Sequence, residues 1–344
     1  MGLRILCISF IIPLLMLSSC VQSKEKRNVI ISGNIVDNHL NNYRMGGNLC
    51  RIGGKLYFNY QKSGFDYGLM EISDNSAKKI YHEGFRLKDN IFLNHRFLNY
   101  RDTLYSVFDN IKYFDFENKV FQDFSFIPLG ENNVIQDISI QNRYILYTIA
   151  DSTQSQVFPV PSELYLYDII SKTNRIIIDK DLIAFYPKNE KIYYVIQQNG
   201  NYKICIFDVE LQQDIGIFDL PGYDANGLII DDEKNMVFNV VAYDKVNDAD
   251  LNSLYIIDLD DTTKLDLVYS CYDYYYNYNV YNGAVFVCTE NGLKKFTDGQ
   301  ELLLCDITPR ECYIVDDKWV YFVDYDSALW RVTQDGNDLQ KVYG

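Results

Sequence analysis

The residues with the clearest potential for chemistry form an acidic stretch from Asp244 to Asn252. Asp248 and Asp250 alternate with other residues, as oxygen ligands do at the start of a calcium-binding loop. Ser253 stands where such a loop needs its turn glycine, and no carboxylate follows where the loop would close. We therefore predict no metal here and interpret Asp244, Asp248 and Asp250 as ligand-binding candidates on a solvated hairpin tip.

A second candidate is the tyrosine-rich segment that begins at Asp273 and runs on to Asn279. Exposed tyrosine rings beside Asp and Asn hold sugars and peptides, because the ring stacks while the polar groups form hydrogen bonds. We predict that Asp273, Tyr274, Tyr275 and Tyr276 belong to the same ligand-binding face as the acidic stretch. The alternative is that alternate tyrosines pack into the core, since the segment leads into a strand.

Sequence signatures of catalysis are missing. The chain contains neither a G-x-S-x-G nor an H-E-x-x-H motif. Its three histidines are His39, His82 and His95, so a histidine set distributed around a ring is excluded. Glycosidase chemistry needs only two carboxylates, and the chain has 47 Asp and Glu residues. We assign no catalytic residue and no cofactor, and keep a carboxylate-based enzyme as an alternative.

The charge balance limits the possible partners. The formal net charge is −15, whereas a nucleic-acid-binding surface needs clustered positive charge. The same acidity disfavours docking on anionic lipid headgroups. We predict no nucleic-acid partner, and expect the acidity to keep a chain with 30 tyrosines in solution.

The N-terminus predicts the compartment. An apolar run from Ile5 to Met16 is too short to span a membrane and fits the core of a signal peptide. The residues Leu17-Ser18-Ser19-Cys20 resemble the bacterial lipobox, in which the cysteine is diacylated and becomes the new N-terminus. We predict a signal peptide over 1–19, a lipidated tether over 20–28 and an extracytoplasmic protein anchored to the cell membrane through Cys20. An ordinary cleaved signal with a chance cysteine is the alternative.

The cysteines beyond Cys20 give no metal or redox motif, because no C-x-x-C pair occurs. Their even number permits disulfides outside the cell, but several lie in apolar strand patterns such as Ile204-Cys205-Ile206. We favour buried free thiols that pack as small hydrophobic groups.

Repeats organise the remainder of the chain. A strand rich in Tyr, Ile and Val, a tight turn and a second such strand recur along it, and no capped helical pattern of a dozen residues appears. One residue of each unit serves as an anchor, and these residues follow one another at intervals of 35 to 48, by subtraction of their positions. The anchors, which we place on the inner strand of each unit, are Tyr57, Tyr105, Leu146, Tyr193, Phe238, Phe286 and Tyr321.

A period in the forties with four strand-sized segments is typical of β-propeller blades. We predict an all-β fold in which residues 29–344 form a single β-propeller domain of about seven four-stranded blades. Val29-Ile30-Ile31 lies outside the seven units, and we expect it to pair with the last blade.

The last unit carries a family resemblance. Its residues from Ala328 to Val342 (ALWRVTQDGNDLQKV) resemble a hairpin of the low-density-lipoprotein-receptor-related propeller domain of bacterial lipoproteins, a domain of unknown function. Lys55-Leu56-Tyr57-Phe58 and Lys191-Ile192-Tyr193-Tyr194 resemble the inner-strand motif of that family. The related receptor propellers have six blades, so the resemblance leaves six blades as an alternative.

Three functions are compatible with these features. The first is a non-catalytic binding module that engages a protein, peptide or glycan through its propeller-face loops. The second is an extracytoplasmic hydrolase or lyase that acts on carbohydrate or peptide through carboxylates in the central channel. The third is a structural subunit of an envelope complex. The missing catalytic motifs and the tyrosine-rich loops favour the first.

Overall fold

The computed structural model describes residues 39–44, 46–63, 66–73, 76–84, 96–107, 111–124, 133–141, 143–151, 163–179, 181–220, 224–231, 234–259, 264–272 and 277–344. The predicted signal peptide, Cys20, the tether and the strand expected at 29–31 lie outside these ranges. Within them, no helix has the length and apolar character needed to cross a membrane.

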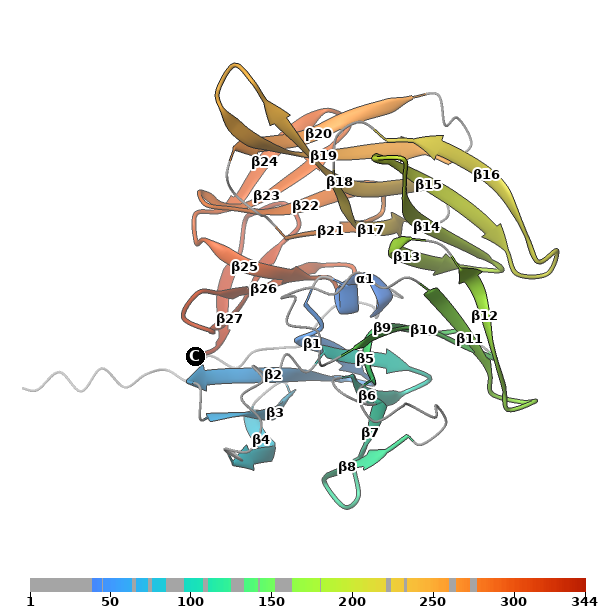
Figure 1. Cartoon of the computed structure of the whole chain (residues 1–344). Helices are drawn as coiled ribbons and strands as arrows, with labels where there is room; N and C mark the ends of the chain where they lie inside the picture. Colours follow the sequence, from blue (N-terminus) through green and yellow to red (C-terminus); the bar gives the residue numbers. More distant parts are fainter. Residues whose placement is uncertain are drawn as a thin grey trace, which may run out of the picture.

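Seven four-stranded antiparallel sheets follow one another along the chain, so the fold is the predicted propeller with seven blades (Figure 1). The strands of blades 1 to 4 are β1 (Leu49–Ile52), β2 (Lys55–Ser63), β3 (Asp66–Ser73), β4 (Ser76–Gly84), β5 (Arg96–Tyr100), β6 (Thr103–Val107), β7 (Ile111–Asp115), β8 (Val120–Asp123), β9 (Asn133–Gln141), β10 (Tyr144–Asp151), β11 (Glu163–Asp168), β12 (Thr173–Asp179), β13 (Leu182–Lys188), β14 (Lys191–Gln198), β15 (Asn201–Asp208) and β16 (Gln213–Asp219). Those of blades 5 to 7 are β17 (Asp224–Asp231), β18 (Asn235–Asp244), β19 (Ala249–Asp258), β20 (Leu265–Tyr272), β21 (Tyr278–Tyr281), β22 (Ala284–Thr289), β23 (Gly292–Thr297), β24 (Gln300–Cys305), β25 (Pro309–Tyr313), β26 (Trp319–Asp324), β27 (Leu329–Thr333) and β28 (Leu339–Tyr343).

Tight turns with left-handed backbone conformations join many neighbouring strands. Asn282 and Gly283 have φ angles of 50° and 71°, and Asp298 and Gly299 have 49° and 72°. Two consecutive positive φ angles match the twist of an antiparallel hairpin, and Asn, Asp and Gly adopt them at the lowest cost. These dipeptides therefore fix where each strand pair reverses.

The repeat anchors lie one strand further from the axis than predicted. All seven fall in the second strand of a blade, as Tyr57 does in β2 and Phe286 in β22, whereas the first strands line the axis. Packing explains why the second strands carry the strongest repeat in the sequence. Each second strand packs against the two neighbouring blades, one on each face of its sheet. All six residues of β22 are buried, as are five of the six in β26.

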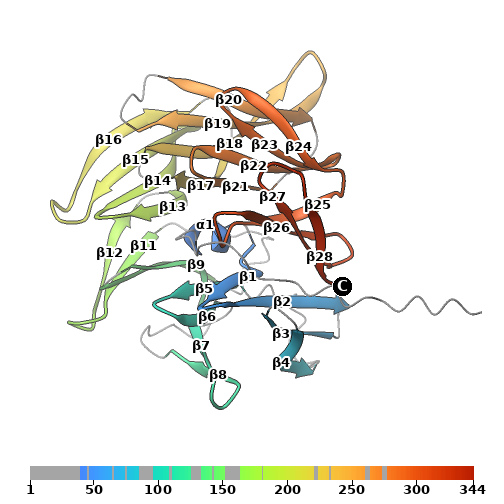
Figure 2. The ribbon, with the colours of Figure 1, turned by 180° about the vertical axis from the view of Figure 1, so that it is seen from behind.

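Side chains link the first blade to the last. Blade 1 consists of β1–β4 and blade 7 of β25–β28, and both views in Figures 1 and 2 place them side by side. Arg51 of β1 forms an ion pair with Asp316, which is fully buried. The ring of Tyr343 meets that of Phe58 edge-on at a centroid distance of 6.1 Å.

A short helix, α1 (His39–Arg44), lies on the propeller axis in both views (Figures 1 and 2). No pattern in the sequence predicts this axial helix. The Asn42 side chain donates to the carbonyl of Ile314 at 2.6 Å and accepts from its backbone nitrogen at 2.9 Å. The hydroxyl of Tyr186 in blade 4 donates to Asn41 Oδ1 at 2.6 Å. A helix this short is unstable alone, so these contacts hold it in place.

Candidate functional site

Two regions of the molecule combine polar chemistry with a defined geometry. One is the turn between β18 and β19, which carries the predicted residues Asp244, Asp248 and Asp250. The other is a cavity beside the axial helix, which the sequence did not predict. Both lie on the same side of the propeller, as their positions along the strands show.

The β18–β19 turn joins the second and third strands of blade 5, as predicted, and the hairpin extends from the body of the molecule (Figure 1). The Asp244 carboxylate organises its tip: Oδ1 accepts from the backbone nitrogen of Val246 at 2.8 Å, and Oδ2 accepts from the Tyr272 hydroxyl at 2.7 Å. Asn247 Nδ2 donates to the same Oδ2 at 2.7 Å and to the Tyr272 hydroxyl at 2.8 Å.

These hydrogen bonds stabilise the ionised carboxylate. The pKa of Asp244 falls from its ordinary value of 3.8 to about 2, mainly because of the bond from Tyr272 and then the bond from Asn247. The pKa of Tyr272 rises because its hydroxyl donates to this carboxylate. At neutral pH the turn is therefore tied to the neighbouring strand β20 by a charge-assisted network.

Asp248, the second predicted aspartate, also holds a tyrosine hydroxyl at the tip. Asp248 lies at the tip with a φ of 55° and accepts a hydrogen bond from the hydroxyl of Tyr243. Tyr243 and Tyr272 are 50% and 44% exposed, so both rings keep one side open to solvent while their hydroxyls are held. We call the group of Tyr243, Asp244, Asn247, Asp248 and Tyr272 the tyrosine tip.

The structure does not bring the predicted aspartates together in the way that ligands of one cation would be. Asp248 bonds to Tyr243 at the tip, whereas Asn252, the third member of the alternating pattern, is 1% exposed inside blade 5. In the described ranges, no three His, Cys, Asp or Glu side chains are grouped closely enough to hold a metal ion. Asp250 is half-buried opposite Tyr243 in the β18–β19 ladder.

The other predicted residues, Asp273 to Tyr276, lie outside the described ranges. Their place in the chain is still informative, because they directly follow Tyr272 of the tip and lead from β20 into β21. The connection therefore joins blades 5 and 6, as predicted. The side chain of Tyr278, at the start of β21, is buried.

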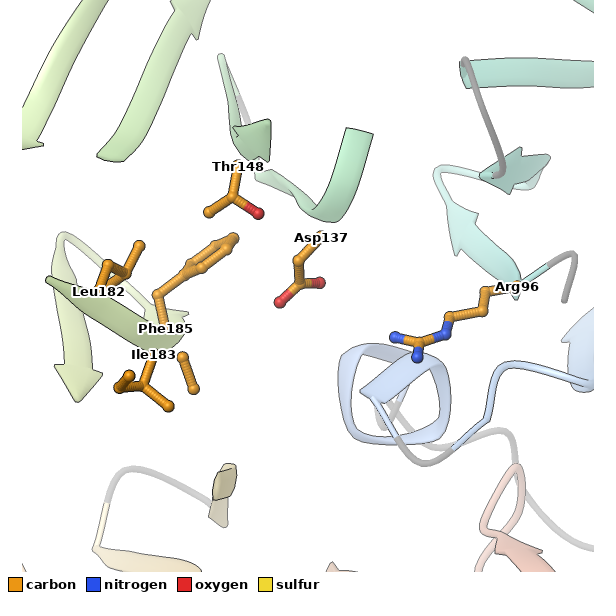
Figure 3. A pocket seen from close by; sticks show the side chains of 7 residues that line it. Arg96, Asp137, Thr148, Leu182, Ile183 and Phe185 are labelled. Carbon is orange, nitrogen blue, oxygen red and sulfur yellow. The ribbon is translucent and has the colours of Figure 1, made fainter. Parts of the chain in front are cut away.

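The cavity has a volume of about 150 Å³ and lies between blades 3 and 4 next to the axial helix (Figure 3). Three polar side chains contribute to its wall, those of Arg96, Asp137 and Thr148. The remainder is apolar and comes from the start of β13, where the lining residues are Leu182, Ile183, Ala184 and Phe185.

An arginine of the axial helix holds the polar wall of the cavity in place. Arg44 of the axial helix forms an ion pair with Asp137 and places its guanidinium 4.5 Å from the centre of the Phe185 ring. The other carboxylate oxygen of Asp137 accepts from the backbone nitrogen of Ile138 at 2.8 Å. Thr148 is fully buried, and its hydroxyl has no hydrogen-bond partner among the described residues.

The cavity lies toward the tyrosine-tip side of the ring. Arg96 and Leu182 are the first residues of β5 and β13, so they mark the end of the channel where the chain enters each innermost strand. In an antiparallel four-stranded blade, the turn between the second and third strands lies at that same end. Cavity and tyrosine tip thus share one face.

Comparisons with known proteins agree with the fold. Neither protein-family models nor curated proteins give a match. Among solved structures, Kuenenia stuttgartiensis hydrazine synthase superposes with a TM-score of 0.56 at 11% identity, over 91% of this chain and 98% of that chain. An oligogalacturonate lyase in complex with manganese gives 0.56 at 12% identity, over 89% of this chain and 96% of that one.

The WD40 propeller domain of Doa1 gives a TM-score of 0.52 at 10% identity, over 89% of this chain and 96% of that one. These similarities establish a shared fold. The chain is a seven-bladed β-propeller with distant structural relatives. Propellers with these similarities include both enzymes and other proteins, so function has to be argued from the sites.

Proposed function

We propose that this propeller is a non-catalytic binding module of the cell envelope, anchored to the membrane by a diacylglyceryl group on Cys20. It engages a protein, peptide or glycan through the face that carries the tyrosine tip and the Asp273–Tyr276 segment. The lipobox-like sequence before Cys20 supports the location, and the geometry of the tip supports the mode of binding.

The observation that carries the proposal is the fixed orientation of two exposed tyrosine rings. Binding normally costs side-chain entropy, of about 0.5–1.5 kcal/mol for each ordered side chain. Tyr243 and Tyr272 have their hydroxyls already held by Asp248 and Asp244, so less of this cost remains. Rigid aromatic anchors beside adaptable polar groups are the arrangement found in binding surfaces for peptides and sugars.

The carboxylate geometry favours this function over the hydrolase or lyase. General acid–base hydrolysis of a glycoside needs two carboxyl groups across the scissile bond. Among the described residues that line the axial cavity, Asp137 is the one carboxylate, and Arg44 and the Ile138 nitrogen occupy its two oxygens. An acid held as an ion pair in this way is poorly suited to donate a proton.

The test is ligand capture on glycan and peptide arrays and by pull-down, using the chain from residue 28 onward. The double variant Tyr243→Ala/Tyr272→Ala should lose at least tenfold in apparent affinity. An aromatic anchor that becomes buried on binding contributes about 2 kcal/mol or more. The melting temperature of this variant should fall only slightly, since the hydrogen bonds that it removes lie at an exposed hairpin tip. Tyr274→Ala and Tyr275→Ala should also weaken capture without lowering the melting temperature.

A matched control comes from the opposite face. Ile170 and Leu211 are 74% and 62% exposed, in turns between the third and fourth strands of blades 3 and 4. The variant Ile170→Ala/Leu211→Ala should capture ligand as wild type does. Undiminished capture by the tyrosine variants, or loss only with the control pair, would reject the proposed face.

A further inference from the structure

The contacts of the axial helix show in which direction the chain runs along the channel. Near the start of the helix, Asn41 Nδ2 donates to the carbonyl of Val280 at 3.4 Å. The Tyr186 hydroxyl lies 2.6 Å from Asn41 Oδ1 and 3.4 Å from the carbonyl oxygen of Ile230. Val280 and Ile230 are the next-to-last residues of β21 and β17, where these innermost strands leave the channel. The helix therefore begins at the face opposite the tyrosine tip.

The residues that follow make their contacts closer to the tyrosine tip. Arg44, at the end of the helix, pairs with Asp137 and lies over the ring of Phe185, and both partners are in the middle of their strands. Asn48 then donates to Glu311 in the middle of β25 at 2.5 Å, and β1 begins at the tip side of the channel. The chain thus crosses the channel from the opposite face to the face that carries the tyrosine tip.

Cys20 is joined to the entry point of the channel by a short stretch of chain. It lies 19 residue steps before His39, by subtraction of their positions. A random-coil chain of 19 residues has a typical end-to-end distance of about 24 Å. A domain of about 300 residues has an outer radius of about 25 Å, so the route from the axis around the rim to the other face is about 50 Å long. Cys20 is therefore confined to the side of the propeller where the chain enters.

That same face carries exposed apolar side chains on neighbouring hairpins. Ile170 and Leu211 are 74% and 62% exposed in the turns between the third and fourth strands of blades 3 and 4, and Phe116 is exposed in the corresponding turn of blade 2. Arg175 Nη1 donates to Gln212 Oε1 at 3.1 Å, which joins the hairpins of blades 3 and 4. Figures 1 and 2 show the β7–β8, β11–β12 and β15–β16 tips one after another along the rim. Apolar side chains that share one exposed face are typical of an interaction surface.

We infer that this face lies against the lipid bilayer, with Ile170 and Leu211 in the interfacial layer and the tyrosine tip pointing away from the membrane. The inference rests on the lipid anchor at Cys20 that belongs to the proposed function. Two acyl chains keep the protein at the bilayer, so even a weak contact of a few apolar side chains becomes intramolecular and orients the propeller. Because the net charge is −15, the contact depends on apolar burial and not on anionic headgroups.

The test uses the full-length protein, purified with its lipid and reconstituted in phosphatidylcholine vesicles whose acyl chains are brominated. A fluorescent amino acid replaces Ile170, Leu211 or, as the matched control on the other face, Val246, which is 92% exposed. Brominated chains quench a fluorophore only where it enters the bilayer. We expect at least twofold quenching at positions 170 and 211 and none at position 246. Added anionic phosphatidylglycerol should not increase the quenching.

A second set of variants tests whether the apolar side chains orient the propeller. The fluorophore now replaces Glu117, which is exposed in the β7–β8 turn of the same face. Ile170→Glu/Leu211→Glu should remove at least half of the quenching at this position, whereas Val246→Glu should leave it unchanged. The substituted side chains are exposed, so each variant should melt close to wild type. Full quenching in the double variant would overturn the assignment of the contact to these side chains.

Mass spectrometry of the N-terminal peptide separates this inference from the proposed function. A peptide without a diacylglyceryl group on Cys20 would reject the proposed anchor and this inference with it. With the lipid present, quenching at position 246, equal quenching at all three positions or none at any of them would overturn the inference alone. Loss of ligand capture by the tyrosine variants has no bearing on these outcomes.

Discussion

Arg51 Nη1 lies 3.0 Å from Asp316 Oδ2, and this ion pair joins the first blade of the ring to the last. Both side chains are almost inaccessible, at 5% and 0% exposure. Asp316 also accepts from the backbone nitrogens of Lys318 and Trp319 at 3.1 and 2.8 Å. Burial nevertheless raises the pKa of Asp316, so the ionised pair is maintained against a desolvation cost.

Breaking one side of this pair should therefore cost more than removing the pair as a whole. Asp316→Ala leaves a buried guanidinium, and we expect the free energy of unfolding to fall by about 3–5 kcal/mol in urea denaturation. The double variant Arg51→Met/Asp316→Asn removes both charges and keeps an oxygen for the backbone donors of Lys318 and Trp319, so it should recover most of that loss. Asp219→Ala, which breaks the exposed pair with Lys203, should cost less than about 1 kcal/mol. Equal losses in the single and double variants would contradict this account.

The axial helix should contribute to stability through Asn42. This side chain satisfies both backbone groups of Ile314 and receives a hydrogen bond from Asn279 at 2.9 Å. Asn42→Ala removes the side-chain partner of both backbone groups of Ile314, so we expect a loss of about 2–3 kcal/mol in the free energy of unfolding. The exposed Asn291 on the β22–β23 turn gives the control, since Asn291→Ala should change stability by less than about 0.5 kcal/mol. Equal effects of the two substitutions would show that the axial helix is dispensable.

The tyrosine tip has a defined pH dependence. The pKa of Asp244 is depressed to about 2, so its contribution to stability is complete above about pH 4 and is lost as the pH falls through 2. NMR titration of the Asp244 carboxyl carbon should show this low value in the wild-type protein. Tyr272→Phe removes the largest cause of the shift, and the pKa should then rise toward 3.8. An unchanged pKa in Tyr272→Phe would mean that the hydroxyl does not bind this carboxylate.

The cysteines should differ in reactivity. The described cysteines are free thiols, five of them buried and Cys271 half-buried. Burial raises the pKa of Cys271 above its ordinary value of 9.0, so its reaction with a disulfide reagent should be slow at pH 7 and accelerate as the pH rises. Cys271→Ser should abolish the fastest phase of thiol labelling in the native protein. A fast phase that persists in this variant would place the reactive thiol elsewhere.

The sequence predicted the propeller because its strongest signal comes from the most buried strands. Residues such as Phe286 and Tyr321 repeat regularly because neighbouring blades press on both faces of their strands. The same fact explains the misplaced anchors, since the innermost strands are more polar and give a weaker pattern. The turn dipeptides Asn282-Gly283 and Asp298-Gly299 mark hairpins by local chemistry alone, because both residues of each pair adopt positive φ angles.

The centre of the ring was beyond sequence analysis for a different reason. The axial helix has six residues, and its asparagines are poor helix formers that take this conformation because the surrounding strands bind them. Arg96, Asp137 and Thr148 come together only when the ring closes, and no spacing along the chain predicts that they line one cavity. An aspartate inside the strand pattern Ile135–Ile140 is the one local hint that the channel is polar at that point.

The most direct test of the binding role is site-specific photocrosslinking in cells that produce the protein. A photoreactive phenylalanine analogue replaces Val246, which is 92% exposed at the tyrosine tip, or Ile170, which is 74% exposed on the opposite face. The account predicts light-dependent adducts of defined mass from position 246 and none of them from position 170. Adducts from position 170 alone, or the same products from both positions, would contradict it.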